Sequence, residues 1–237
     1  MSAPVITLSA IRTDLHARAD PADALNLRRF FKAGPGEYGE GDILAGVRVP
    51  VLRMLAATYQ AAPRRVVLGL LRSPVHEERM LALLIMIRQY TAATPPRCQR
   101  IHDDYLAHTA YVNNWDLVDL SAPHLVGAHL AGRNRSLLMR LAKSPSLWER
   151  RIAMLATLHF IRAGSFDDTL VLAEILLTDD EDLIHKATGW MLREIGNRDR
   201  AVEEAFLKRH ARSMPRTMLR YAIERFDEPT RQRYLRR

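Results

Sequence analysis

The chain has 237 residues, 48% of them hydrophobic, which is enough apolar side chain to bury a full core. Its single cysteine, Cys98, cannot form an internal disulfide, and its longest apolar run, Met80 to Ile87, is far shorter than the roughly 20 residues that a membrane helix needs. These features predict a soluble cytoplasmic protein with no membrane contact. The net charge is +8, and residues 186–237 carry 14 basic and 7 acidic side chains, an asymmetry typical of a surface that binds a polyanion, although charge alone does not identify nucleic acid.

Apolar residues recur at helical spacing, as in Met80, Leu84 and Ile87, whereas the alternation typical of strands is scarce. We therefore predict an all-α protein made of short helices. Several prolines are spaced so that most can occupy the first turn of a helix, where the missing N–H costs nothing. They are Pro21, Pro50, Pro63, Pro74, Pro95, Pro145 and Pro215.

The glycine-dense segment 34–42 lacks the Gly-Lys-Ser/Thr ending of a phosphate-binding loop and follows no predicted strand. We expect a turn between helices there. No long linker or low-complexity tract follows, so we expect one domain over residues 1–237.

Residues 73–84 and 144–155 share a Ser-Pro start, a Glu-Arg pair and the same apolar spacing, at an offset of 71 residues. This offset equals about two helix-pair repeats of roughly 35 residues, which favours a curved α-solenoid of HEAT-like antiparallel helix pairs, an ARM/HEAT-like superhelix. The concave side of such a solenoid is a natural groove for a long ligand.

Residues 113–119, Asn-Asn-Trp-Asp-Leu-Val-Asp, predict a helix start that places Trp115 and Asp119 on one face. Taken alone, a helical tryptophan is more often part of the core, and a first-turn aspartate more often complements the helix dipole.

Two later segments combine tryptophan with cations. In residues 147–151, Leu-Trp-Glu-Arg-Arg, one arginine can turn towards a groove for bidentate contact with phosphate, and a solvated surface pair is the alternative. Further along, Lys186, Trp190 and Arg193 share a helix face, which favours a binding surface. The alternative is that the long aliphatic parts of Lys186 and Arg193 only cover apolar surface.

The Asn-Trp-Asp-Leu-Val-Asp, Trp-Glu-Arg-Arg-Ile-Ala and Lys-Ala-Thr-Gly-Trp-Met-Leu-Arg-Glu runs resemble signature segments of the AlkD-type DNA alkylation repair family. The likeness extends to residues 38–42 and 46–50 and to Arg53, so it covers most of the chain from about residue 26 to residue 226. The resemblance implies an all-helical HEAT-like protein that binds duplex DNA containing alkylated bases.

The resemblance also implies the residues of the active site. Two tryptophans and one aspartate would surround the damaged nucleotide, and an arginine would complete the group. These positions match Trp115, Trp190, Asp119 and Arg151, with Arg150 as the alternative for the arginine. We expect phosphate contacts from Arg150, Lys186, Arg193, Arg48 and Arg53.

The chemistry expected is hydrolysis of the bond between an alkylated base and deoxyribose. In its transition state the sugar carries positive charge, which a nearby carboxylate stabilises. Asp119 is the expected carboxylate. We predict cationic purines alkylated at N3 or N7, such as 3-methyladenine and 7-methylguanine, as substrates. We further expect a monofunctional glycosylase of base excision repair without lyase activity, a monomer associated with the nucleoid when bound to DNA.

Other chemistries have less support, because the nine histidines lie without a metal-ligand spacing and no Gly-x-Ser-x-Gly elbow occurs. No metal and no cofactor are expected. Two alternatives stay open: a non-catalytic HEAT-like module that binds damaged or branched DNA, and a protein-binding scaffold.

Overall fold

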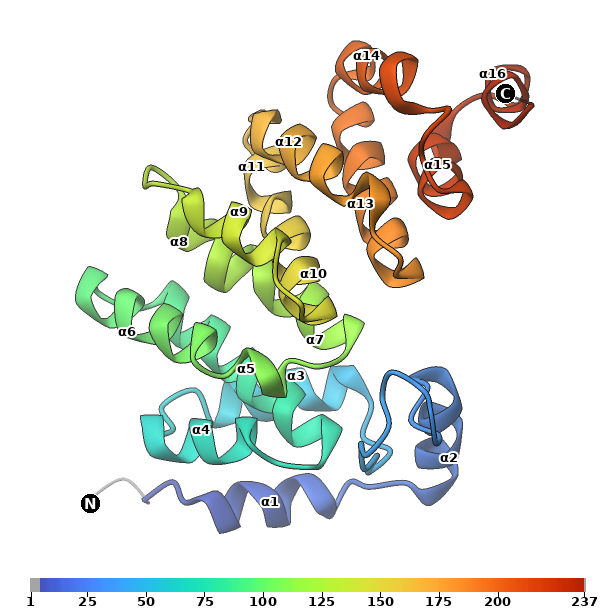
Figure 1. Cartoon of the computed structure of the whole chain (residues 1–237). Coiled ribbons are helices and arrows are strands. Elements are labelled where there is room, and N and C mark those ends of the chain that lie inside the picture. Colours follow the sequence, from blue (N-terminus) through green and yellow to red (C-terminus); the bar gives the residue numbers. More distant parts are fainter. Residues whose placement is uncertain (1–4, 237) are drawn as a thin grey trace. The chain divides into compact units, whose positions relative to one another are not determined.

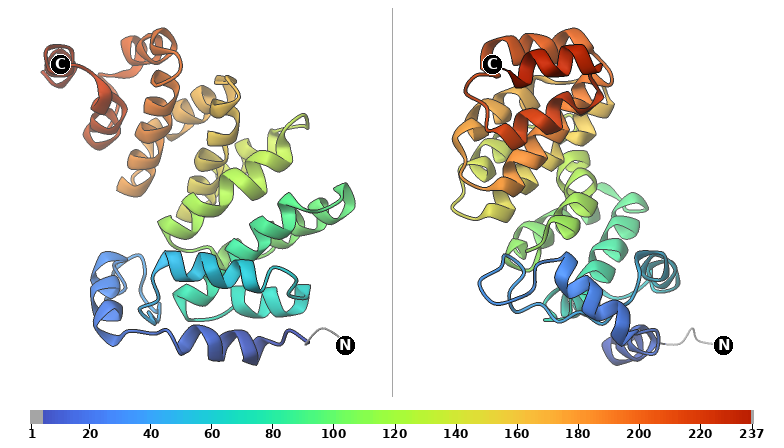
Figure 2. Two further views of the ribbon diagram at one scale, coloured as in Figure 1. Left: turned by 180° about the vertical axis from the view of Figure 1, so that it is seen from behind. Right: turned by 90° about the vertical axis from the view of Figure 1, so that its right-hand side faces the viewer.

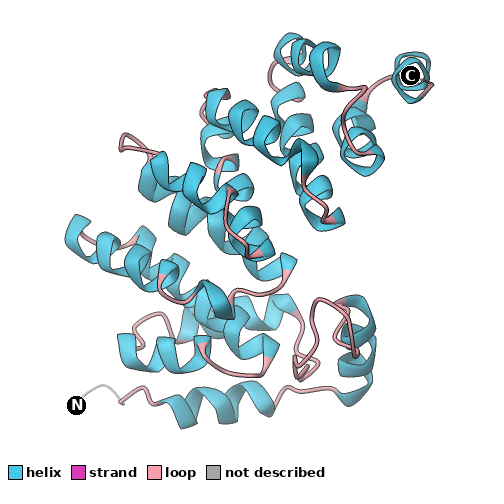
Figure 3. Cartoon of the chain, in the orientation of Figure 1, coloured by secondary structure: helices cyan, strands magenta, loops and turns pink. Residues whose placement is uncertain are grey.

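The structure, a computed structural model, describes residues 5–236. Within this range the chain forms helices joined by turns and loops, and no strand is present (Figure 3). The prediction of an all-α protein is confirmed.

The chain divides into two compact units, one ending at Ser121 and one beginning at Ala122. This division does not test whether the two units form one domain, so the single domain expected over residues 1–237 stays a prediction. The helices up to the boundary are α1 (Leu8–His16), α2 (Pro21–Phe30), α3 (Val49–Thr58), α4 (Arg64–Leu71), α5 (His76–Thr91), α6 (Pro95–Leu106), the 3₁₀ turn η1 (Thr109–Tyr111) and α7 (Trp115–Ala122). The remaining helices are the π turn η2 (Pro123–Gly127), α8 (Ala128–Leu130), α9 (Ser136–Ala142), α10 (Leu147–Ala156), α11 (Leu158–Arg162), α12 (Asp167–Ile175), the 3₁₀ turn η3 (Leu176–Thr178), α13 (Asp182–Gly196), α14 (Arg200–His210), α15 (Arg216–Ala222), the 3₁₀ turn η4 (Ile223–Arg225) and α16 (Glu228–Leu235).

Local signals in the sequence start several of these helices. Asp20 precedes α2, and its carboxylate accepts the N–H groups of Ala22 and Asp23, which have no partner inside the helix. The first turns of α2, α3, α6 and α16 contain Pro21, Pro50, Pro95 and Pro229. The expected use of proline is therefore confirmed for three of the seven predicted positions, and Pro63 and Pro215 directly precede α4 and α15.

In the first unit, α5 is the central helix. It packs against α3, α4 and α6, and α4 packs in turn against α1 (Figures 1 and 2). Because neighbours surround it, every residue of α5 from His76 to Met86 is buried, including four charged or titratable side chains at its start. In the second unit, α13 has the same place, with α10, α12, α14 and α15 packed around it.

The two segments with a Ser-Pro start have the same local structure. Ser73 accepts the N–H of Val75, and Ser144 accepts the N–H of Ser146. Arg79, on α5, donates to the carbonyl oxygen of Ser73, and Arg150, on α10, donates to that of Ser144, each at 3.0 Å. The similarity seen in the sequence is thus a repeated way of starting a helix.

Glu77 holds the loop between α2 and α3 against the start of α5. Its carboxylate, 2% exposed, accepts the N–H groups of three consecutive residues at 2.9, 2.8 and 3.3 Å: Ala45, Gly46 and Val47. Gly46 has φ +82°, and a Cβ there would lie 2.0 Å from the carbonyl oxygen of Asp20. Only glycine permits both this backbone conformation and this close approach.

Replacement of Glu77 by alanine should destabilise the protein by about 2–4 kcal/mol, because three loop N–H groups lose a charged acceptor away from water. Urea unfolding of the two proteins measures the difference. Glu40→Ala is the matched control, since Glu40 is exposed and accepts one N–H group, that of Gly36; its effect should stay within about 0.5 kcal/mol. Equal losses in the two variants would contradict the role given to Glu77.

Candidate functional site

Helix α7 carries two of the predicted site residues. Asn114 lies just before it, fully buried, and its side-chain oxygen accepts the N–H of Trp115 at 2.8 Å, while its backbone carbonyl accepts the N–H of Val118. Trp115 and Asp119 are four residues apart in the helix and therefore share a face, and both are half-buried. The helix start and the shared face agree with the expectation from the sequence.

The indole of Trp115 packs against two aromatic rings at the end of α2, edge-on against Phe30 and tilted against Phe31. The ring centroids of Phe30 and Trp115 lie 5.4 Å apart at 71°, and those of Phe31 and Trp115 lie 5.6 Å apart at 43°. Phe30 is 60% exposed, whereas Phe31 is buried. The three rings form a wall with a buried side and a side open to solvent.

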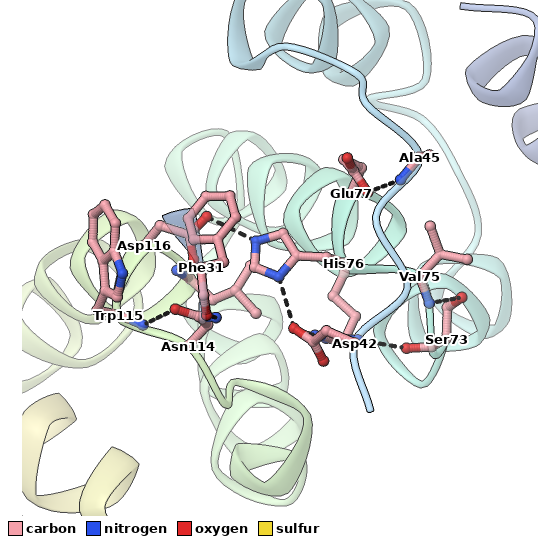
Figure 4. Close-up of polar contacts among 12 residues, drawn as sticks. Phe31, Asp42, Ala45, Ser73, Val75, His76, Glu77, Asn114, Trp115 and Asp116 are labelled. Atoms are coloured by element: carbon pink, nitrogen blue, oxygen red, sulfur yellow. Dashed lines mark hydrogen bonds and ion pairs between the residues drawn. The ribbon is translucent and has the colours of Figure 1, made fainter. Parts of the chain in front are cut away.

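A buried polar network lies behind this wall. The imidazole of His76 stacks on Phe31 with centroids 4.6 Å apart at 25°. Its Nδ1 lies 3.0 Å from Asp42 Oδ2 and its Nε2 lies 2.8 Å from Asp116 Oδ2, so the ring bridges two carboxylates from different segments (Figure 4). Arg79 donates to the same Asp42 oxygen at 2.7 Å.

The charges of this network balance. Burial lowers the pKa of His76, but hydrogen bonds to Asp116 and Asp42 outweigh it and raise the pKa from 6.5 to about 9. Burial raises the pKa of Asp42, but the bonds from His76 and Arg79 outweigh it and hold this pKa below its usual value. An imidazolium with two N–H donors is therefore the form that fits between two carboxylates at neutral pH.

Tyr105, on α6, is a buried residue whose pKa is affected by the charge of Asp119. The hydroxyl of Tyr105 is buried and lies 2.9 Å from the Ser121 hydroxyl. Burial raises the pKa of Tyr105, the Ser121 bond lowers it, and the negative charge of Asp119 raises it further. The carboxylate of Asp119 thus acts electrostatically on a group of the core while its residue stays partly open to solvent.

In the second unit, α10 carries the two consecutive arginines in different environments. Arg151 is 4% exposed, and its Nη1 donates to the carbonyl oxygen of Leu183 at 2.5 Å, at the start of α13. Arg150 makes two bonds to the carboxylate of Asp179, at 2.6 and 3.2 Å. Both arginines are therefore engaged within the protein, Arg150 by an ion pair and Arg151 by a buried hydrogen bond, and the choice between them stays a prediction.

Helix α13 carries the remaining aromatic residue and two cations. Trp190 is half-buried, and its Nε1 donates to Glu194 at 3.3 Å. Lys186 pairs with Asp182 at 2.7 Å, and Arg193 pairs with Glu224 of η4. The shared helix face expected for Lys186, Trp190 and Arg193 follows from the continuous helix.

The two N-terminal cations, Arg48 and Arg53, also lie in different environments. Arg48 makes two bonds to the Asp23 carboxylate of α2, at 2.6 and 2.8 Å. Arg53 is exposed on α3 and pairs with no other residue of the described chain. Of the five side chains expected to contact phosphate, four therefore have a carboxylate partner within the protein.

The network around His76 was not predicted from the sequence. The run His76–Arg79 stands at the start of a helix, where charged residues usually face solvent, so it gives no sign of burial. Its one signal is position, because it directly precedes the longest apolar run of the chain.

No group of histidine, cysteine, aspartate or glutamate within residues 5–236 is arranged to hold a metal ion. Across the same range, the helices are too short or too polar to cross a membrane.

The raised pKa of His76 predicts a pH-dependent stability. A pKa raised from 6.5 to about 9 stabilises the folded state fully below pH 6.5, and this contribution, about 3 kcal/mol, is lost as the pH rises from 6.5 through 9. Urea unfolding of wild type and His76→Gln at several pH values should show a difference that shrinks over that interval. Burial also raises the pKa of Glu203, to about 8, but Glu203 is present in both proteins and cancels. A difference that does not vary with pH would refute the charged bridge.

Comparisons with known proteins give the family. A sequence model described as DNA alkylation repair enzyme matches residues 11–226. A solved structure described as a predicted DNA alkylation repair enzyme from Enterococcus faecalis is similar in fold, with a TM-score of 0.68 and 17% sequence identity, over 89% of this chain and 98% of that one. No curated protein matches. Since the family model spans nearly the whole chain, this protein belongs to the DNA alkylation repair enzyme family.

Proposed function

We propose that this protein is a DNA glycosylase that hydrolyses the N-glycosidic bond of cationic N3- and N7-alkylated purines in duplex DNA. The observation that carries the proposal is the shared face of α7, on which an aromatic plate and a carboxylate lie partly open to solvent in a member of a DNA alkylation repair family. This pairing suits a positively charged nucleotide.

Asp119 is the proposed catalytic carboxylate. As the bond between C1′ and the purine nitrogen breaks, positive charge develops on the sugar, and water adds at C1′ and loses a proton to Asp119 or to solvent. A unit pair at about 4 Å contributes about 4 kcal/mol at an effective dielectric constant of 20, or roughly three decades in rate. This amount suffices best where alkylation has already made the base a cation, because the base then leaves as a neutral molecule.

Trp115 and Trp190 are the proposed contacts with the cationic nucleotide, each contributing about 0.5–2 kcal/mol through cation–π attraction. Arg151 is proposed to take part in the same reaction. The remaining cations, Lys186, Arg193, Arg48, Arg53 and Arg150, are proposed to contact phosphate. Because four of these five are already paired with carboxylates, phosphate contact requires each pair to open or to share its cation.

The decisive test is release of 3-methyladenine and 7-methylguanine from methylated duplex DNA. Wild type should release base, and Asp119→Asn, which keeps the shape and removes the charge, should be slower by on the order of a hundredfold or more. Asp103→Asn, an exposed carboxylate on α6, is the control and should match wild type. Duplex binding without release by wild type would reject the glycosylase and favour a non-catalytic DNA-binding module.

Binding to duplex DNA should depend strongly on salt. With about five phosphates contacted, one by each proposed cation, affinity should fall about five hundredfold between about 50 and 200 mM salt, because bound counterions are released. Arg53→Ala should make the slope of log affinity against log salt shallower by about 0.9, and Arg18→Ala, an exposed arginine beyond the end of α1 that is not among the proposed phosphate contacts, should leave it unchanged. Fluorescence anisotropy with a labelled duplex measures both. An affinity insensitive to salt would point to a protein partner.

A further inference from the structure

We propose that His76 is a positioning residue of the repair reaction: by joining Asp42 to Asp116 and stacking on Phe31, it holds the α7 face that carries Trp115 and Asp119. The proposal rests on the proposed glycosylase for its kinetic consequence, and its structural part stands independently of it. It is carried by contacts around the first turn of α7.

The first step concerns what fixes α7. This helix spans only Trp115–Ala122, so its direction depends on the groups that hold its first turn. Asp116, in that turn, accepts from His76 at 2.8 Å with one carboxylate oxygen and from the N–H of Leu117 at 2.8 Å with the other. Asn114, just before the helix, donates to the carbonyl oxygen of Phe31 at 3.3 Å. The start of α7 is thus tied to α5 and to the end of α2.

The second step concerns Trp115. Phe31 lies between the imidazole of His76 and the indole of Trp115 and touches both (Figure 4). Trp115 is also the residue next to Asp116. A movement of His76 therefore reaches Trp115 by two routes, through the ring that it packs against and through the backbone beside it.

The third step concerns why histidine stands here. The groups that face its ring are Asp42 from the loop before α3, Asp116 from α7 and Arg79 from α5. Only the imidazolium offers one N–H donor to each carboxylate, on opposite edges of a flat ring that also stacks on Phe31. Loss of its proton removes the His76 donor from one of the two carboxylates and removes the positive charge between them, so that their mutual repulsion is no longer offset there.

The fourth step concerns space. A Cβ at Gly39 would lie 2.6 Å from the carbonyl oxygen of Phe31 and 3.3 Å from the side-chain nitrogen of Asn114. The loop that brings Asp42 to His76 is therefore packed directly against the backbone of the aromatic wall. Little room is left for Phe31 to move without moving the start of α7.

The first experiment uses the wild-type chain labelled with 5-fluorotryptophan. Its three tryptophans give three ¹⁹F signals, assigned with Trp→Phe variants. We expect the Trp115 signal to shift between pH 7 and pH 10 with a midpoint near the pKa of His76, about 9, while the signal of Trp148 stays in place. A Trp115 signal that does not move overturns the proposal, whatever the activity of the protein.

The second experiment measures base release in single turnover at pH 7 with saturating protein. His76→Gln keeps one hydrogen bond but carries no charge, and it should lower the rate constant about tenfold or more while changing the affinity for duplex DNA less than twofold. The matched control is His16→Gln, which should keep the wild-type rate. It replaces a histidine of α1 that lies away from α7 and is bonded to buried Glu78.

The outcomes separate the two proposals. If wild type releases no base, the glycosylase fails, and the fluorine titration still decides whether His76 controls Trp115. If wild type releases base and folded His76→Gln does so at the same rate, the positioning role is wrong while the glycosylase stands. Circular dichroism and urea unfolding confirm that each variant is folded at the pH of the assay.

Discussion

The first unit depends on four consecutive titratable side chains, His76–Arg79, that are buried at the start of α5. Together they bind several parts of the unit: His76 joins the loop before α3 to α7, Glu77 holds that loop, Glu78 accepts from α1, and Arg79 closes the turn before its own helix. An unpaired buried charge costs several kcal/mol, so these partners must all be in place together. The start of one helix thereby makes its neighbours interdependent, including the helix that carries the proposed catalytic carboxylate.

Much of the fold could be predicted because its signals are local. Apolar spacing identified α5, proline and capping residues identified helix starts, and the shared Ser-Pro pattern identified a repeated helix start. The buried network could not be predicted in this way. Whether His76 faces water or a core is decided by Asp42 and Asp116, which are 34 and 40 residues away and arrive on other elements. A charged run at a helix start looks the same in both cases.

The candidate site shows a similar limit. Its aromatic residues and its carboxylate were found from the sequence because helical spacing alone puts Trp115 and Asp119 on one face. The ion pairs of the cations could not be predicted from the sequence, because their partners, among them Asp179 and Glu224, lie on other segments of the fold. A count of positive residues therefore overstates the charge that a polyanion meets. What matters is how readily each internal carboxylate gives up its cation.

The repeated Ser-Pro start has a consequence for how this chain tolerates changes in length. Serine, proline and the returning arginine close a ring within seven residues, at Ser73–Arg79 and again at Ser144–Arg150. Because the ring contains its own hydrogen bonds, a whole pair of helices inserted or deleted between two copies leaves both starts intact. A single residue inserted inside the ring turns the arginine away from its carbonyl. Lengthening by complete pairs is accordingly the change in length that this architecture accepts most easily.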